Sequence, residues 1–243
     1  MMSAPAAAQR TRIKICGLTR EADVDAAVQA GADAVGFVMY APSARSVTPA
    51  RAAALARRLP PFVTPVLLFV NESADRVAQA CALVPGAALQ FHGDESADLC
   101  HRASGQGARP YLRAARIPLD DPAGFDLLEF ASTYSSAQAI LLDAHVEGFG
   151  GGGKAFDWSR LPTSVNCHLV LSGGLTPANV TDGILQVRPR CRSLAVDVSS
   201  GVEPEGPGNK GLKDAEKINR FVAAVRAADS QLAQSQHVLL PTA

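Results

Sequence analysis

The sequence alternates along most of its length between short apolar runs and longer stretches with helical spacing. Most of the apolar runs are continuous rather than alternating, which is typical of strands buried on both faces of a parallel sheet. There are eight of them, at residues 12–17, 33–40, 64–70, 88–93, 109–117, 139–144, 167–174 and 193–200. Eight strand–helix units predict one α/β domain, a closed (β/α)₈ TIM barrel. A doubly wound open sheet is the alternative, because the number of strands alone does not prove closure.

The stretches between the runs define the limits of the domain. Three of them begin with a residue suited to cap a helix: Thr48, Ser73 and Thr176. The stretch after the sixth run is rich in glycine and is predicted to be mostly loop. We expect a disordered N-terminal arm at 1–11, the catalytic barrel at 12–230 and a flexible C-terminal tail at 231–243.

Composition excludes several classes of function. The formal net charge of the 243 residues is zero. The chain therefore lacks the excess of basic residues that would indicate nucleic-acid binding. No apolar run is long enough to span a membrane, and the N-terminus lacks the apolar core of a signal peptide. None of the five cysteines forms a Cys-x-x-Cys pair. Free thiols and a cytoplasmic location are therefore expected.

Reactive side chains gather where the predicted strands end. In this fold the carboxyl ends of the strands carry the active site. The candidates there are Lys14, Cys16, Arg45, His92, Asp143, Ser172, Gly173, Gly174, Asp197, Ser199, Ser200 and Gly201. The opposite ends of the strands carry no comparable set, which predicts a site at one end of the barrel.

The ends of the seventh and eighth strands predict a phosphate site. Gly173 and Gly174 can bring backbone N–H groups close to a ligand, and 199–201 can do the same beside them. The loops after these two strands are the usual phosphate site of the fold. An ordinary Ser-Gly-Gly turn is the alternative interpretation.

Cys16 ends a strand and shares one face of it with Lys14. A buried cysteine is usually an inert hydrophobic residue, and this interpretation suits the other four. At Cys16, however, a nearby ammonium would lower the thiol pKa towards neutrality. In a closed barrel the eighth strand lies beside the first, so Asp197 is expected to pair with Lys14 and keep it charged.

Asp143 ends the apolar run 139–144, where an isolated carboxylate would be expensive to bury. We therefore predict a catalytic role, with a cap of the next turn as the alternative. His92 is either a site residue or a buried hydrogen-bonding group. Asp143, His145 and Glu147 alternate, a spacing that suits metal ligands, but no second cluster supports them, and no metal is expected.

The glycine-rich segment 148–154 resembles a P-loop. Ala155 stands where that motif needs Ser or Thr, and no good helix follows. We therefore predict a flexible lid over the pocket instead of a nucleotide site.

The chain resembles the phosphoribosylanthranilate isomerase family of tryptophan biosynthesis. The resemblance covers residues from about 12 to about 225, nearly the whole barrel. It is carried by KICGLT (14–19), GADAVGFVMYAPSARSVTP (31–49), LLFVN (67–71), LQFHGDE (89–95), LLDAHVEGFGGGGKAFDW (141–158), LSGGLTPANV (171–180) and AVDVSSGVEPEGPGNKGLKDAEKI (195–218).

The resemblance implies an Amadori rearrangement without any cofactor. N-(5-phosphoribosyl)anthranilate would become 1-(2-carboxyphenylamino)-1-deoxyribulose 5-phosphate. By similarity, Cys16 is the general base that removes the sugar C2 proton, and Asp143 is the general acid that opens the furanose. Arg45 would bind the anthranilate carboxylate, and the two glycine- and serine-containing loops would bind the phosphate.

Other functions remain as alternatives from the residues alone. Another phosphosugar enzyme with a barrel fold would require a metal cluster, paired acids or lysines at the ends of the strands. A non-catalytic binder of a phosphorylated ligand would not need a reactive thiol. The expected partner is a small phosphorylated substrate, and the chain is expected to be a monomer or a homodimer.

Overall fold

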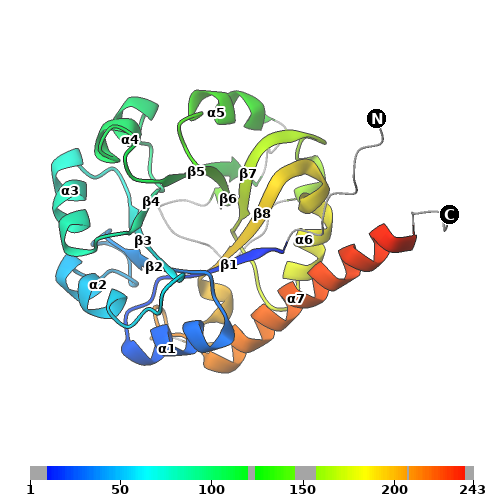
Figure 1. Ribbon diagram of the computed structural model, residues 1–243, viewed down its shortest axis with the longest axis horizontal. Helices are drawn as coiled ribbons and strands as arrows, with labels where there is room; N and C mark the ends of the chain where they lie inside the picture. Colours follow the sequence, from blue (N-terminus) through cyan, green and yellow to red (C-terminus); the bar gives the residue numbers. More distant parts are fainter. Residues whose placement is uncertain (1–9, 120–123, 146–156, 207, 239–243) are drawn as a thin grey trace.

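The computed structural model describes residues 10–119, 124–145, 157–206 and 208–238. Within these residues, eight parallel strands form a closed barrel in the order β1 to β8 (Figure 1). The strands are Arg12–Cys16 (β1), Ala34–Val38 (β2), Thr64–Phe69 (β3), Ala88–Phe91 (β4), Tyr111–Pro118 (β5), Ala139–His145 (β6), Val165–Leu171 (β7) and Cys191–Val198 (β8). The pairing of β1 with β8 closes the ring. The barrel prediction is confirmed, and the open-sheet alternative is wrong.

The helices surround the barrel. They are Glu21–Ala30 (α1), Pro49–Ala56 (α2), Ala74–Leu83 (α3), Ala97–Ala103 (α4), Leu127–Thr133 (α5), Val180–Val187 (α6) and Ala215–Val238 (α7). Between β6 and β7 the described residues, 157–164, form one short 3-10 turn, Trp158–Arg160 (η2), and the glycine-rich part of this stretch lies outside the described residues. Two further 3-10 turns, Arg188–Arg190 (η3) and Ser200–Val202 (η4), flank β8.

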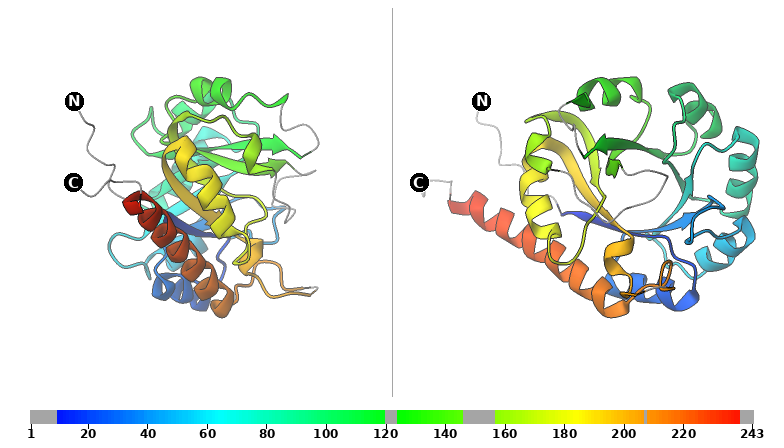
Figure 2. Two further views of the ribbon diagram at one scale, coloured as in Figure 1. Left: turned by 90° about the vertical axis from the view of Figure 1, so that its right-hand side faces the viewer. Right: turned by 180° about the vertical axis from the view of Figure 1, so that it is seen from behind.

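Helix α7 lies between α6 and α1 and completes the ring of helices (Figures 1 and 2). It extends to Val238, so residues 231–238 of the expected C-terminal tail are helical. Leu232 packs against the hydrophobic core, which explains why the helix continues there. No helix of the described ranges is long and apolar enough to cross a bilayer.

Local capping explains where several helices begin. The side chains of Thr48 and Ser73 accept hydrogen bonds from backbone N–H groups in the first turns of α2 and α3, as predicted. Thr176 does not cap α6. Instead Asn179 binds the N–H of Thr176 and the carbonyl of Gly174, which orders the preceding turn, and the helix starts at Val180.

The core has two layers because strand side chains point alternately outward and inward. On β6, Ile140 and Leu142 belong to the main core between strands and helices. Leu141, between them, belongs to a smaller cluster inside the barrel with Val170 of β7. Inward-facing positions nearer the carboxyl ends of the strands carry the polar residues of the site.

Candidate active site

One cavity at the carboxyl end of the barrel collects most of the residues that the sequence singled out. Its lining includes Cys16, Arg45, His92, Asp143, Ser172, Gly173, Gly174, Asp197, Ser199 and Ser200. Lys14 and Gly201 are the predicted residues that do not line it. Apolar side chains complete the wall, among them Val38 of β2, Leu68 of β3 and Val70 just after β3. The structure therefore brings most of the predicted residues together at one end of the barrel.

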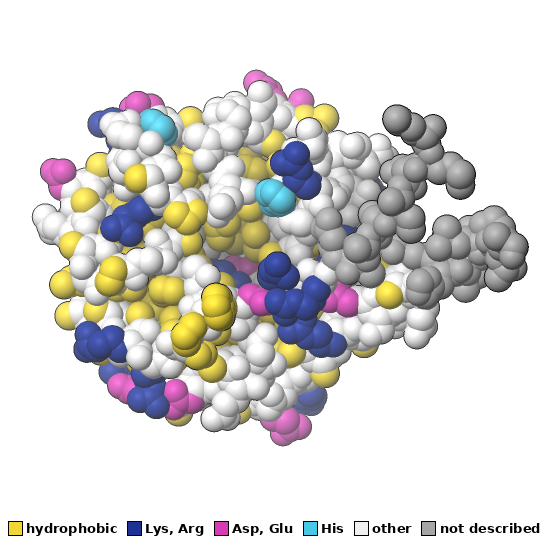
Figure 3. All heavy atoms as spheres, viewed as in Figure 1, with side chains coloured by type: hydrophobic (Ala, Val, Ile, Leu, Met, Phe, Trp, Pro, Cys, Tyr) yellow, Lys and Arg dark blue, Asp and Glu magenta, His cyan; other side chains and the backbone are white. Residues whose placement is uncertain are grey.

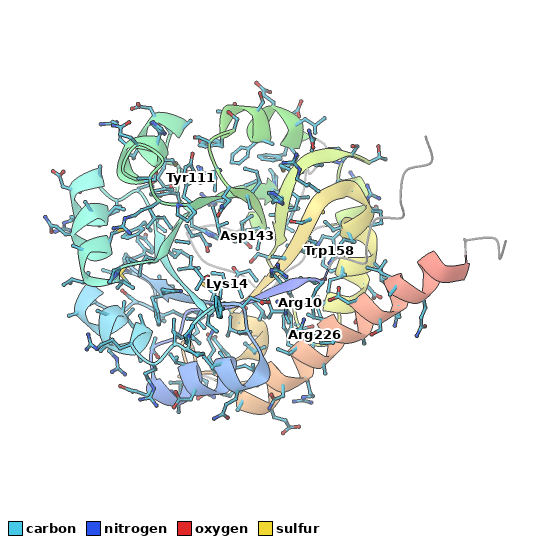
Figure 4. All side chains as sticks on the ribbon, viewed as in Figure 1. Arg10, Lys14, Tyr111, Asp143, Trp158 and Arg226 are labelled. Carbon is cyan, nitrogen blue, oxygen red and sulfur yellow. The ribbon has the colours of Figure 1, made fainter. Side chains whose placement is uncertain are left out.

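Lys14 lies two residues before Cys16 on β1, next to the cavity but outside its lining. Its Nζ is 2.8 Å from Oδ1 of Asp197, and both side chains are 5% exposed. The register of β1 and β8 sets Lys14 directly opposite Asp197, so the predicted pair is confirmed. Ser172 donates a hydrogen bond to the other oxygen of Asp197, at 3.3 Å. Figure 4 shows Lys14 and Asp143 within the ring of strands.

The protonation of Cys16 differs from the prediction. Burial raises the pKa of the Cys16 thiol above its ordinary value, and the ammonium of Lys14 only partly offsets this. Burial also works against the charge on Lys14, but Asp197 and Cys16 outweigh it and raise the pKa of Lys14. Lys14 therefore lowers the thiol pKa as predicted, but the predicted net shift towards neutrality is wrong, because desolvation exceeds the charge effect.

His92 and Asp143 are in direct contact. Nε2 of His92 lies 2.8 Å from Oδ2 of Asp143, and Nδ1 lies 2.9 Å from Nε2 of Gln90. An amide nitrogen can only donate, so this geometry places the ring proton on Nε2, facing the carboxylate. His92 is thus both a cavity residue and a buried hydrogen-bonding group.

The loop after β7 comes very close to Asp143. Gly173 has φ of +73°, and a Cβ there would lie 2.7 Å from Oδ1 of Asp143 and 2.6 Å from the backbone nitrogen of Ala144. Only glycine satisfies both conditions without strain. Gly201, in the turn η4 that follows β8, packs against the same loop, since a Cβ on it would lie 1.9 Å from the carbonyl oxygen of Leu175. The two predicted anion-binding loops are therefore adjacent.

Arg45 lines the cavity but is also part of a buried ion network. Its Nε and Nη2 donate to the two carboxylate oxygens of Glu203, at 2.7 and 2.9 Å. Lys213 donates to Glu203 at 2.8 Å and to the carbonyl of Ser199 at 3.0 Å. No hydrogen bond between described residues uses Nη1 of Arg45, so this edge can still take a ligand carboxylate.

Sequence reasoning missed Glu203, Lys213 and Gln90. Gln90 had a usable signal, because it lies two residues before His92 and so shares its face of β4. Glu203 and Lys213 follow β8 in a segment without regular periodicity, and nothing in their spacing indicates that they meet at Arg45.

Parts of the predicted site lie outside the described residues. The proposed lid at 148–153 and Glu147 fall there, and the side chain of His145 is not described. The described part of the chain holds no group of three His, Cys, Asp or Glu residues that could bind a metal ion. Figure 3 shows the barrel from its other end, where the strands begin, so the cavity lies on the far side of that view.

A thiol and a carboxylate face one cavity of a (β/α)₈ barrel, beside two loops rich in glycine and serine, which is the usual arrangement of an enzyme site in this fold class. The family model described as N-(5'phosphoribosyl)anthranilate (PRA) isomerase matches residues 13–224. The chain belongs to this family and is an isomerase, which confirms the resemblance seen in the sequence.

Individual relatives agree with the family assignment. The chain is 63% identical over 227 residues to N-(5'-phosphoribosyl)anthranilate isomerase of Methylibium petroleiphilum, covering 93% of this chain and 99% of that one. It is 57% identical to the corresponding protein of Dechloromonas aromatica, covering 92% and 100%.

Solved structures share the fold. The phosphoribosyl anthranilate isomerase of Thermotoga maritima superposes with a TM-score of 0.73 at 37% identity, covering 89% of this chain and 99% of that chain. Another related structure contains reduced 1-(o-carboxyphenylamino)-1-deoxyribulose 5-phosphate, with a TM-score of 0.70 at 35% identity and the same coverage.

Proposed function

We propose that this protein converts N-(5-phosphoribosyl)anthranilate into 1-(2-carboxyphenylamino)-1-deoxyribulose 5-phosphate in tryptophan biosynthesis, with Cys16 as general base and Asp143 as general acid. The observation that carries the proposal is that Cys16 and Asp143 face the same cavity from β1 and β6. An aldose amine becomes a ketose amine, so the reaction is redox-neutral and needs no cofactor.

The proposed chemistry uses one proton donor and one proton acceptor. Asp143 gives a proton to the furanose ring oxygen, the C1–O bond breaks, and the nitrogen lone pair forms an iminium ion at C1. Cys16, as thiolate, then removes the proton from C2, and the enolamine that forms tautomerises to the ketone. Lys14 favours the thiolate at that step, since its charge lowers the thiol pKa against the effect of burial.

The order of strands around the rim fits a substrate that carries an anion at each end. Arg45, in the loop after β2, would bind the anthranilate carboxylate, and the loops after β7 and β8 would bind the phosphate. The strand β1 lies between β2 and β8 in the ring. A ligand held at both ends would therefore place its sugar carbons beside Cys16.

Two further expectations complete the proposal. All five cysteines are free thiols in the structure, which supports a cytoplasmic location. We propose a monomer or a homodimer. One structural relative from Thermotoga maritima is described as dimeric.

The test is turnover of freshly generated N-(5-phosphoribosyl)anthranilate by the wild type, Cys16→Ala and Asp143→Asn. We expect each variant to lose at least about 10²-fold in kcat, the usual contribution of a positioned acid or base. Both should still bind reduced 1-(o-carboxyphenylamino)-1-deoxyribulose 5-phosphate, which controls for folding. A wild type that binds this compound without turnover would instead be a non-catalytic binder.

A further inference from the structure

A charged side chain lies in the apolar layer between the barrel and the helices. Arg113 is on the outward face of β5, next to Glu95 at 3.4 Å, and the two side chains are 5% and 0% exposed. The guanidinium also lies over the rings of Phe130 and Tyr134, with its Cζ 5.6 and 4.8 Å from their centroids. A buried ion pair seldom stabilises a protein more than apolar side chains would. The hydrogen bonds of this pair indicate another role.

The hydrogen bonds of this pair reach the turn that carries His92. Arg113 donates to the carbonyl of Phe91 and to the carbonyl of Gly93, each at 3.1 Å. Glu95 accepts the N–H of Gly93 at 2.9 Å. The residues on both sides of His92 are therefore held by one guanidinium and its counter-charge. We call Arg113 and Glu95 the His92 clamp.

The side chain of His92 is held from the other face of the sheet. Gln90 fixes Nδ1, and Nε2 meets Asp143. With the backbone fixed by the His92 clamp, the imidazole has little freedom to rotate or shift. The N–H that it presents is aimed at one oxygen of the carboxylate.

We propose that the His92 clamp is a positioning device: Arg113 and Glu95 hold His92, and through it Asp143, in the orientation needed to deliver the acid proton. This inference rests on the proposed role of Asp143. Neither clamp residue lines the cavity, so both act through His92. A small displacement of a catalytic group lowers the reaction rate by a large factor. Loss of Arg113 or Glu95 should therefore lower the rate measurably, although neither residue contacts the substrate.

The main test compares Arg113→Met with Arg113→Lys. Methionine keeps much of the volume but removes every donor, and we expect kcat to fall roughly 10–100-fold, as for other partners that orient a site residue. Lysine keeps a positive charge and N–H donors beside Glu95 and should restore most of the loss. Affinity for reduced 1-(o-carboxyphenylamino)-1-deoxyribulose 5-phosphate should stay unchanged in both.

Two further variants guard against misfolding and general destabilisation. Arg113→Met/Glu95→Gln removes both charges, leaves no unpaired ion, and should show the same kcat loss. Arg188→Met/Asp229→Asn is the matched control, because it removes another largely buried ion pair that does not line the cavity. We expect this control to lose stability at unchanged kcat. A clamp variant that behaves like the control would overturn the proposal.

A double-mutant cycle tests the route of the effect. If the clamp acts through His92, Arg113→Met should cause no further loss of kcat in a His92→Asn background. Independent, multiplicative losses would contradict the inference. The ¹⁵N signals of the His92 ring should also change in Arg113→Met and return in Arg113→Lys. Unchanged ring signals refute the clamp even if the wild type had no isomerase activity, whereas lack of that activity refutes only the proposed function.

Discussion

Glu203 joins two buried cations at the edge of the cavity. It accepts two hydrogen bonds from Arg45, one from Lys213 at 2.8 Å and one from the backbone N–H of Gly211 at 3.2 Å. The substitution Glu203→Gln keeps the shape but removes the charge. Arg45 and Lys213 would then face each other with 8% and 6% exposure and without this counter-charge.

The expected cost follows from that geometry. Removing one partner of a buried ion pair typically costs about 3–5 kcal/mol, because the remaining charge stays desolvated. That is a large part of a total stability of roughly 5–15 kcal/mol. In a chain of this size each kcal/mol of lost stability lowers the Tm by about 2–4 °C, so the Tm should fall by about 6–20 °C.

Urea unfolding followed by circular dichroism at pH 7 measures the loss directly. The control is Glu21→Gln, which breaks a half-exposed ion pair with Arg51 and should leave the midpoint unchanged. KM should also rise in Glu203→Gln, because Arg45 loses the contact that orients it. A loss below about 1 kcal/mol with unchanged KM would refute the view that Glu203 holds these cations in place.

Three further predictions concern the thiol and the pH dependence of stability. The rate of alkylation of Cys16 by iodoacetamide should rise with pH with a midpoint above 9.0, the ordinary pKa of a thiol. The substitution Lys14→Met should move this midpoint higher still. A midpoint near neutrality would contradict the effect of burial on the thiol pKa. Gly36→Ala should lower kcat by about tenfold or more in a folded protein, because its Cβ would lie 2.6 Å from Sγ of Cys16; kinetics beside thermal unfolding would decide this. Burial opposes the charge of Glu203, but Arg45 and Lys213 outweigh it and lower the Glu203 pKa below the ordinary 4.5. The stabilising contribution of Glu203 is therefore complete above pH 4.5 and is lost as the pH falls through its lower pKa in the folded state. The free energy of unfolding should consequently decrease less with falling pH in Glu203→Gln than in the wild type.

The sequence alone determined the barrel and the end of it that carries the site. The pattern of apolar residues that marks a buried strand is complete within a few neighbouring residues. Runs such as 139–144 therefore indicate buried strands without any tertiary information. Parallel strands also place their carboxyl ends at one rim, which brings Cys16 and Asp143 to the same face. The pairing of Lys14 with Asp197 followed from the same logic, because closure of eight strands makes β8 the neighbour of β1.

Only the tertiary structure decided which side chains meet and how they are charged. Glu203 reaches Arg45 from 158 residues away through a segment without periodicity, and Arg113 holds the turn of His92 from the far side of the sheet. The pKa of Cys16 depends on how completely its surroundings exclude water, which neighbours in sequence do not reveal. Local periodicity records whether a residue is buried, whereas partners and desolvation arise from the packing of segments that are distant along the chain.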